Sequence, residues 1–219
     1  QSLEVMESMR ENLKFSLLME LVEKDQQALL SLLAHFRIPV QEFAIILQNP
    51  EEKILTDCQN NLHKLNSLTL IEISLDPEIQ KEYYYTSPLI KELLSIYEHS
   101  PLPFSHKQAG AYHYHIFSNM DASLTELEQA FFHFYEAKEK EHIENIGDIL
   151  SNIYYRSSMF HNAFFYARQV YEMLGKSTRS LIQNRLGLIF RLYGQNDKAV
   201  ALFQNALSLC RNKGNKEGE

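Results

Sequence analysis

Hydrophobic positions in the last third of the chain recur with the spacing of paired helices. Ala199, Phe203 and Ala206 form a stripe of small, large and small side chains on one helical face, and Leu186-Gly187 precede them by two short helices and a turn. The same stripe occurs earlier in the chain, at Ala130, Phe134 and Ala137, and more loosely at Ala163, Ala167 and Val170. The pattern predicts consecutive helical hairpins that pack through small residues.

The spacing of these stripes indicates a repeat architecture. Ala130 and Ala163 lie 33 residues apart, and Ala163 and Ala199 lie 36 apart. A period of about 34 residues is typical of tetratricopeptide-like helix–turn–helix repeats. Such repeats bury their apolar faces against their neighbours, and their curved inner surface receives a partner. We therefore expect an α-α solenoid of about three such repeats over residues 104–219, with binding as its function.

Proline and glycine divide the chain into two parts. All six prolines lie at or before position 103, and all seven glycines lie at or after position 110. The two prolines of Pro101-Leu102-Pro103 prevent a helix from continuing through this segment. We therefore expect one domain over residues 1–100 and a second over residues 104–219.

The first part mixes helical and extended patterns. Residues of high β propensity alternate over 68–75 and return in Tyr83-Tyr84-Tyr85-Thr86, which predicts two strands separated by the breaker Asp76-Pro77-Glu78. Ser87-Pro88 combines a cap residue with proline at the first helical position, which predicts a closing helix running to Tyr97. Apolar periodicity predicts further helices over 13–22, 24–36, 41–47 and 53–66.

This order of elements is a winged-helix arrangement with a small β-hairpin. The predicted fold class is therefore mainly α, a winged-helix domain followed by the α-α solenoid. Within the solenoid, the second helix of the first repeat is expected to begin at Ser123, with Glu126 completing a capping box.

Three stretches of the first part, Ala28–Phe36, Leu62–Ile71 and Tyr84–Leu93, resemble the winged-helix segment of signal-transduction ATPases with numerous domains, the STAND class. The resemblance covers roughly residues 13–97 and lies in hydrophobic patterns. In that class the winged helix couples nucleotide state to a downstream sensor made of repeats, which the second part resembles. No G-x-x-x-x-G-K-[ST] loop occurs in the chain, so the resemblance implies that the ATPase core lies upstream.

Both ends of the sequence favour a piece of a longer protein, and we expect a bacterial signalling protein. The chain begins with Gln1 rather than Met, and residues 214–219 resemble the linker that opens a further repeat. A terminal repeat normally carries a polar capping face, and none follows here. Pairing of the uncapped last repeat with a second copy, which would give a homo-oligomer, is a further hypothesis.

Composition narrows the class of partner and the compartment. The net charge of −7 argues against a general binder of nucleic acid or of anionic membranes, because both require a basic surface. No apolar run approaches the roughly 18 residues of a membrane-spanning helix. The two cysteines, Cys58 and Cys210, form no CxxC pair, which favours the cytoplasm over an oxidising compartment.

Residues that could carry chemistry lack the spacing that chemistry needs. Helical metal ligands lie at i and i+4, whereas His113 and His115 are two residues apart and point in different directions. No G-x-S-x-G elbow is present, and neither cysteine lies in a catalytic motif. We therefore expect no catalytic residue, metal site or cofactor, with an enzyme built from scattered residues as the open alternative.

DNA binding is the main alternative for the first part, because many winged helices read the major groove. The candidate recognition helix, Lys53–Lys64, carries two lysines and one aspartate and follows Glu51-Glu52, and the wing Asp76–Glu82 is acidic. A helix that faces phosphates needs more positive charge. The sequence thus favours a coupling domain over a DNA-binding transcription regulator with a peptide-sensing repeat domain.

The first helix of each repeat supplies the expected binding face. Asparagine and arginine side chains on this face can bind the backbone and carboxylates of an extended protein or peptide partner. The alternative, to which we give equal weight, is that this polar face is only solvated and binds no partner. The candidate groove residues are Asn145, Asp148, Asn152, Tyr155 and Arg156 in the second repeat and Asn184, Leu188 and Arg191 in the third.

Overall fold

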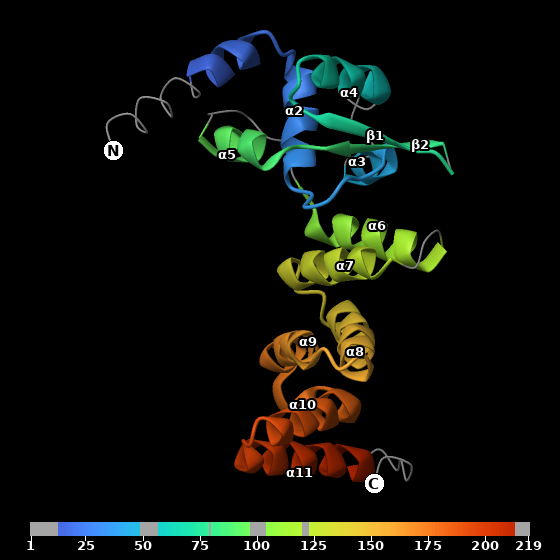
Figure 1. Ribbon diagram of the computed structural model, residues 1–219, viewed down its shortest axis with the longest axis vertical. Coiled ribbons are helices and arrows are strands. Elements are labelled where there is room, and N and C mark those ends of the chain that lie inside the picture. Colours follow the sequence, from blue (N-terminus) through green and yellow to red (C-terminus); the bar gives the residue numbers. More distant parts are fainter. Residues whose placement is uncertain (1–12, 49–56, 79, 97–103, 120–122, 213–219) are drawn as a thin grey trace. The chain divides into compact units, whose positions relative to one another are not determined.

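The computed structural model describes residues 13–48, 57–78, 80–96, 104–119 and 123–212. The chain divides into two compact units, residues 1–109 and 110–219. The described residues are mainly helical and contain one two-stranded antiparallel sheet (Figure 1). The mainly α class with a small β-hairpin is thereby confirmed.

The first unit is built around helix α2 (Lys24–Ala34), which is buried along most of its length. A helical segment at residues 13–20 precedes it. Helix α5 (Pro88–Ile96) begins at the predicted proline, and the Oγ of Ser87 accepts a hydrogen bond from the backbone N–H of Ile90 at 3.4 Å. Among the described residues, this unit also contains α3 (Glu42–Gln48) and α4 (Cys58–Ser67).

The hairpin pairs β1 (Glu72–Asp76) with β2 (Lys81–Tyr85), with Ser74 opposite Tyr83. Val40, between α2 and α3, forms an antiparallel bridge to Tyr84 through two backbone hydrogen bonds of 2.8 and 3.0 Å. A short third segment therefore joins the sheet on the β2 side. The Tyr84 side chain is 2% exposed and anchors the sheet on the core.

The strand predicted over residues 68–75 is wrong at its start, because β1 begins at Glu72. Helix α4 continues to Ser67, and Thr69 then adopts a φ of 58° and donates its N–H to the carbonyl of Asn66 at 2.9 Å. Leu70 is buried in the bend that follows. It is apolar because it packs into the core in this bend, and not because it belongs to a strand. The predicted start of α4 at Lys53 and the end of α5 at Tyr97 lie outside the described residues.

Residues beyond the double proline also belong to the first unit. The backbone N–H of Ser105 donates to the Oε1 of Gln48 at 2.7 Å, and Gln48 is buried. The ring of Phe104 stacks on His35 with centroids 4.5 Å apart and an interplanar angle of 12°. These contacts fix the chain just before α6 (His106–Asn119), in which the boundary between the units falls.

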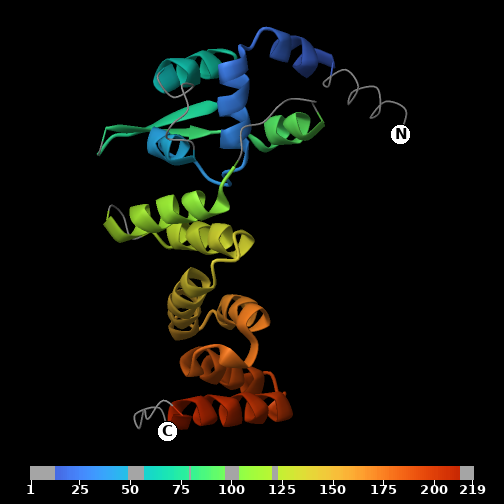
Figure 2. The same ribbon diagram turned by 180° about the vertical axis from the view of Figure 1, so that it is seen from behind.

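The described helices after residue 104 form three successive hairpins (Figure 2). The second helix of each hairpin begins 36 residues after the previous one, at positions 124, 160 and 196. This arrangement confirms the predicted helical repeats. The hairpins are α6 with α7 (Leu124–Glu136), α8 (Lys140–Arg156) with α9 (Phe160–Leu174), and α10 (Ser180–Leu192) with α11 (Asn196–Asn212).

A glycine in the first helix of two hairpins receives a phenylalanine from the second helix. A Cβ added to Gly110 would lie 2.9 Å from the ring of Phe134, and one added to Gly187 would lie 2.5 Å from Phe203. The small-x3-large stripe predicted from the sequence is therefore in the correct register in these two hairpins. In the middle hairpin Val170 and Phe131 fill the space at Gly147 instead.

The capping box predicted at Ser123 and Glu126 does not form. Helix α7 begins at the expected position, but the Ser123 side chain makes no capping hydrogen bond. The Oε2 of Glu126 lies 2.6 Å from the Nδ1 of the buried His113 on α6. A buried imidazole competes successfully for this carboxylate because both groups would otherwise lose their hydrogen bonds to water.

Candidate partner-binding surface

The predicted groove residues of α8 lie on one side of that helix. At about 100° per residue, Asn145, Asp148, Asn152, Tyr155 and Arg156 fall within an arc of roughly 100°. The core side chains of the same helix, Ile143, Ile146, Leu150 and Tyr154, are all buried on the opposite side. Asn152 and Arg156 are exposed, and the other three groove residues are half-buried.

Helix α10 places its three predicted groove residues in the same way. Asn184 and Arg191 are exposed, and Leu188 is half-buried between them. The buried Ile182, Leu186 and Ile189 occupy the other side of the helix. The candidate residues of α8 and α10 are called the first-helix strip below.

An arginine bridge holds the two helices of the strip in register. The Nη1 of Arg185 donates to the Oδ1 of Asp148 at 2.9 Å and to the Oγ of Ser151 at 2.6 Å. The side chains of Arg185 and Asp148 are only 10% and 20% exposed. Asp148 therefore pairs with the neighbouring repeat, and its carboxylate positions α10 against α8.

A second arginine, Arg179, also joins α10 to α8. Its partner on α8, Glu144, lies one helical turn before Asp148. Arg179 forms an ion pair with Glu144 at 3.3 Å, and its backbone N–H donates to the same carboxylate at 2.7 Å. The guanidinium also donates to the amide oxygen of Asn145. Asn145 and Asp148 thus serve the packing of the repeats, which leaves Asn152, Arg156, Asn184 and Arg191 as the exposed polar members of the strip.

Exposed aliphatic side chains that the sequence analysis did not select lie beside the first-helix strip. Ile149 and Ile153 on α8 are 38% and 36% exposed, and Leu181 and Leu192 on α10 are 61% and 55% exposed. Ile149 and Ile153 could have been found from the sequence by helical spacing. Ile149 lies four residues after Asn145, and Ile153 lies four residues after Ile149. This surface therefore combines apolar contacts with the hydrogen-bond donors of amide and guanidinium groups.

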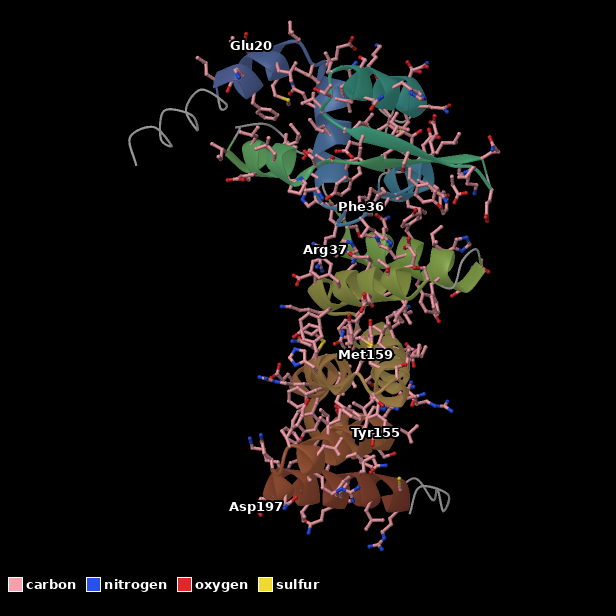
Figure 3. All side chains as sticks on the ribbon, viewed as in Figure 1. Glu20, Phe36, Arg37, Tyr155, Met159 and Asp197 are labelled. Carbon is pink, nitrogen blue, oxygen red and sulfur yellow. The ribbon has the colours of Figure 1, made fainter. Side chains whose placement is uncertain are left out.

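Tyr155 differs from the other predicted groove residues. Its ring packs edge-on against Phe160 with centroids 5.5 Å apart, and it is half-buried beside the core of the repeats (Figure 3). Met159, close by in the chain, is 49% exposed. The Tyr155 side chain therefore contributes one face to packing and the rest to the surface.

A half-buried carboxylate joins the first and second hairpins. The Oε1 of Glu128 on α7 accepts hydrogen bonds from the hydroxyls of Tyr154 and Tyr166, at 2.5 and 2.8 Å. The two tyrosine rings are parallel, with centroids 5.7 Å apart. Burial and the neighbouring Glu128 carboxylate raise the pKa of Tyr154 to about 12. This cluster fixes α8 and α9 against α7.

Three histidines of the repeats are engaged in packing. His113 and His133 are both buried and stack in parallel with centroids 5.4 Å apart, and His142 stacks on Phe134 at 4.3 Å. Within the described ranges, no three histidine, cysteine, aspartate or glutamate side chains gather closely enough to hold a metal ion.

In the first unit, two basic side chains of α4 lie beside acidic ones. Lys64 is 3.7 Å from a carboxylate oxygen of Glu23, and the His63 imidazole is 3.3 Å from that of Glu82. Cys58 is buried, and desolvation with the nearby Glu42 raises the pKa of its thiol to about 12, which keeps it protonated and unreactive. In the part of the chain that is described, no helix has the length and apolar character needed to cross a membrane.

Comparison with known proteins identifies the fold. No protein-family model matches the chain, and no curated protein matches it. Among solved structures, it is similar to a signal-transduction ATPase with numerous domains (STAND) protein with a tetratricopeptide-repeat sensor from Pyrococcus horikoshii, with a TM-score of 0.57 and 15% identity. The match covers 89% of this chain and 27% of that one, so the chain spans about a quarter of the length of its structural neighbour. At this level of identity the comparison establishes a STAND- and tetratricopeptide-like fold.

Proposed function

We propose that this chain is the sensing and coupling region of a larger signalling protein of the STAND class. In this proposal residues 104–219 bind a protein or peptide along the first-helix strip, and residues 1–100 form a winged-helix domain that transmits the event to an upstream nucleotide-binding core. The likeness to a protein with a tetratricopeptide-repeat sensor supports this reading. The region has no catalytic role of its own and works in the cytoplasm.

The winged-helix assignment is supported by the order of elements in the first unit. Three helices, α2 to α4, precede the β1–β2 hairpin, and Val40 adds a short third segment beside β2. Helix α5 closes the arrangement. A rigid domain of this kind, placed between a sensor and an ATPase core, would transmit a displacement without rearranging its own core.

The observation that carries the binding proposal is the fixed spacing of the exposed polar residues. The Arg185–Asp148 and Arg179–Glu144 pairs hold α8 and α10 side by side. Asn152, Arg156, Asn184 and Arg191 are consequently presented on a preformed surface. A preformed surface loses little conformational entropy on binding, which favours recognition of an extended peptide.

A peptide-display selection against the intact chain would test this surface. We expect at least one class of selected peptides to lose at least tenfold in affinity when Asn152 and Arg191 are both changed to alanine. Gln204→Ala, an exposed change on α11, is the matched control and should leave affinity unchanged. If every selected peptide binds the double variant as tightly as the original chain, the strip is not the binding surface.

A DNA-binding transcription regulator is the alternative, and the charges of α4 disfavour it. Lys64 and His63 on that helix both lie beside carboxylates, which would repel phosphates. Titration of duplex DNA at two salt concentrations separates the alternatives. The regulator would be favoured over the coupling domain if the affinity for DNA falls steeply with increasing salt and if Lys64→Gln abolishes DNA binding.

A further inference from the structure

The second helices of the last two hairpins border a groove that is separate from the first-helix strip. It lies between α9 and α11, and residues of α10 form its floor. Its volume of about 670 Å³ is within the range of small-ligand and side-chain sites. The lining consists of Phe164, Arg168, Tyr171, Glu172, Leu186, Phe190, Gln195, Lys198, Ala201 and Leu202.

The floor of the groove is apolar and rigidly packed. Phe164 of α9 meets Phe190 of α10 edge to face, with centroids 5.4 Å apart and an interplanar angle of 84°. Leu186 and Leu202 are 2% and 7% exposed and belong to the core of the repeats. This floor would accept one aromatic or large aliphatic side chain, because burial of an apolar side chain against it removes apolar surface from water.

Two cations border this apolar floor from opposite helices. The Arg168 guanidinium of α9 lies 5.9 Å from the ring centroid of Phe164, and the Lys198 ammonium of α11 lies 5.4 Å from that of Phe190. Both residues are exposed. Glu172 is the single acid of the lining, and it accepts a hydrogen bond from the Nε of Arg168 at 2.6 Å, so the guanidinium retains its Nη donors for a ligand.

We propose that the α9–α11 groove binds an acidic peptide segment, with one aromatic or large aliphatic side chain on the phenylalanine floor and flanking carboxylates on Arg168 and Lys198. Charge complementarity selects this occupant. The lining carries two cations and one anion, in a chain whose net charge is −7. A basic peptide would meet two like charges, which costs affinity and slows association.

This site goes beyond the proposed function because it uses the second helices of the hairpins. Arg168 and Lys198 are on α9 and α11, whereas the first-helix strip is on α8 and α10. The repeats would then hold two peptides at once, one on each set of helices. The second site adds a docking point for an acidic segment of a partner protein to the sensor surface.

The test is a display selection with random peptides against the full chain, followed by affinity measurements on fluorescein-labelled peptides. We expect one enriched class to contain an aromatic or leucine residue between acidic residues. Arg168→Gln and Lys198→Gln should each weaken this class roughly tenfold, the loss expected for one charge-assisted hydrogen bond. Ala201→Tyr, which fills the groove without changing charge, should abolish its binding.

The two surfaces are distinguished by crossing the variants. Asn152→Ala with Arg191→Ala should leave the acidic class unaffected, even if the first-helix strip binds nothing. All of these positions are exposed, and circular dichroism before each titration verifies that the helices are intact. The groove proposal is overturned if no acidic class is enriched, if that class tolerates all three groove variants, or if it loses affinity in the strip variant instead.

Discussion

Gly187 lies directly against the ring of Phe203, so that a Cβ on Gly187 would come within 2.5 Å of the Cε1 atom. This contact joins the first and second helices of the last hairpin. Backbone and ring can approach this closely only because residue 187 has no side chain. The ring in turn fills the space that the missing side chain leaves.

Gly187→Ala should therefore destabilise the repeats by about 1–3 kcal/mol, because the added methyl group forces the Phe203 ring out of its position. Urea unfolding followed by circular dichroism measures the change. Asn184→Ala, an exposed change on the same helix, is the control and should stay within about 0.5 kcal/mol. Combining Gly187→Ala with Phe203→Leu should restore part of the lost stability. A Gly187→Ala variant with the same urea midpoint as the original chain would contradict the packing described.

The Tyr154–Glu128 contact should make stability fall in alkaline solution. Burial and Glu128 raise the pKa of Tyr154 from about 10 to about 12, so folding favours the protonated phenol. The stabilisation is complete below pH 10 and is lost as the pH rises through 12.

Urea unfolding between pH 9 and pH 12 measures this loss. Tyr154→Phe should reduce the slope of stability against pH in that window and should cost about 1–2 kcal/mol at neutral pH, because Glu128 loses a hydrogen bond. Tyr135→Phe, on the half-buried side of α7, is the matched control. An unchanged slope in Tyr154→Phe would mean that folding does not raise the pKa of Tyr154.

The Arg185–Asp148 pair should contribute more than a surface ion pair. Its side chains are 10% and 20% exposed, whereas those of Arg168 and Glu172 are 58% and 45% exposed. We expect Arg185→Met to cost about 1–3 kcal/mol, because Asp148 and Ser151 lose a shared donor. The coupling of the exposed pair should be about 0.5 kcal/mol or less and should decline with salt.

Double-mutant cycles for both pairs, at low and high salt, measure the two couplings. The Arg185–Asp148 cycle should be nearly independent of salt because solvent ions cannot screen a mostly buried pair. Equal couplings in the two cycles would contradict the role of this arginine in aligning α8 with α10.

Three helix ends carry strain that glycine would relieve. Thr69, Lys138 and Ser158 have φ values between 58° and 60°, and Gly194 occupies the corresponding turn after α10 with a φ of 73°. In each turn this residue donates its N–H to a carbonyl three residues back. Thr69 is β-branched, so a positive φ costs it more conformational energy than it costs the other two residues, and it is exposed, so burial does not offset this cost.

Thr69→Gly and Ser158→Gly should each stabilise the protein by up to about 1 kcal/mol, with the larger effect at Thr69. Ser157→Gly is the matched control, because residue 157 has a φ of −83° and gains nothing from glycine. Thermal unfolding of the three variants measures the difference. A drop in melting temperature for both Thr69→Gly and Ser158→Gly would show that the turns are not strained.

The local structure and the repeat could be predicted from the order of residues alone. Helix starts such as Pro88, the small-large stripes and the period of the hairpins depend on residues within a few positions of one another, and helical geometry relates these directly to a face. The exposed sides of α8 and α10 were predictable for the same reason. The predicted strand start at residue 68 was wrong because alternating apolar residues also occur in a turn that places one of them in the core.

The pairing of polar side chains across the hairpins could not be predicted in this way, because it depends on how the helices pack. Arg185 meets Asp148 across 37 positions of sequence, and Glu126 turns from its expected cap to His113 on another helix. Such choices depend on which group is buried beside which, because burial removes water as the competing partner. The α9–α11 groove arises in the same way, from side chains of three helices that no local pattern brings together.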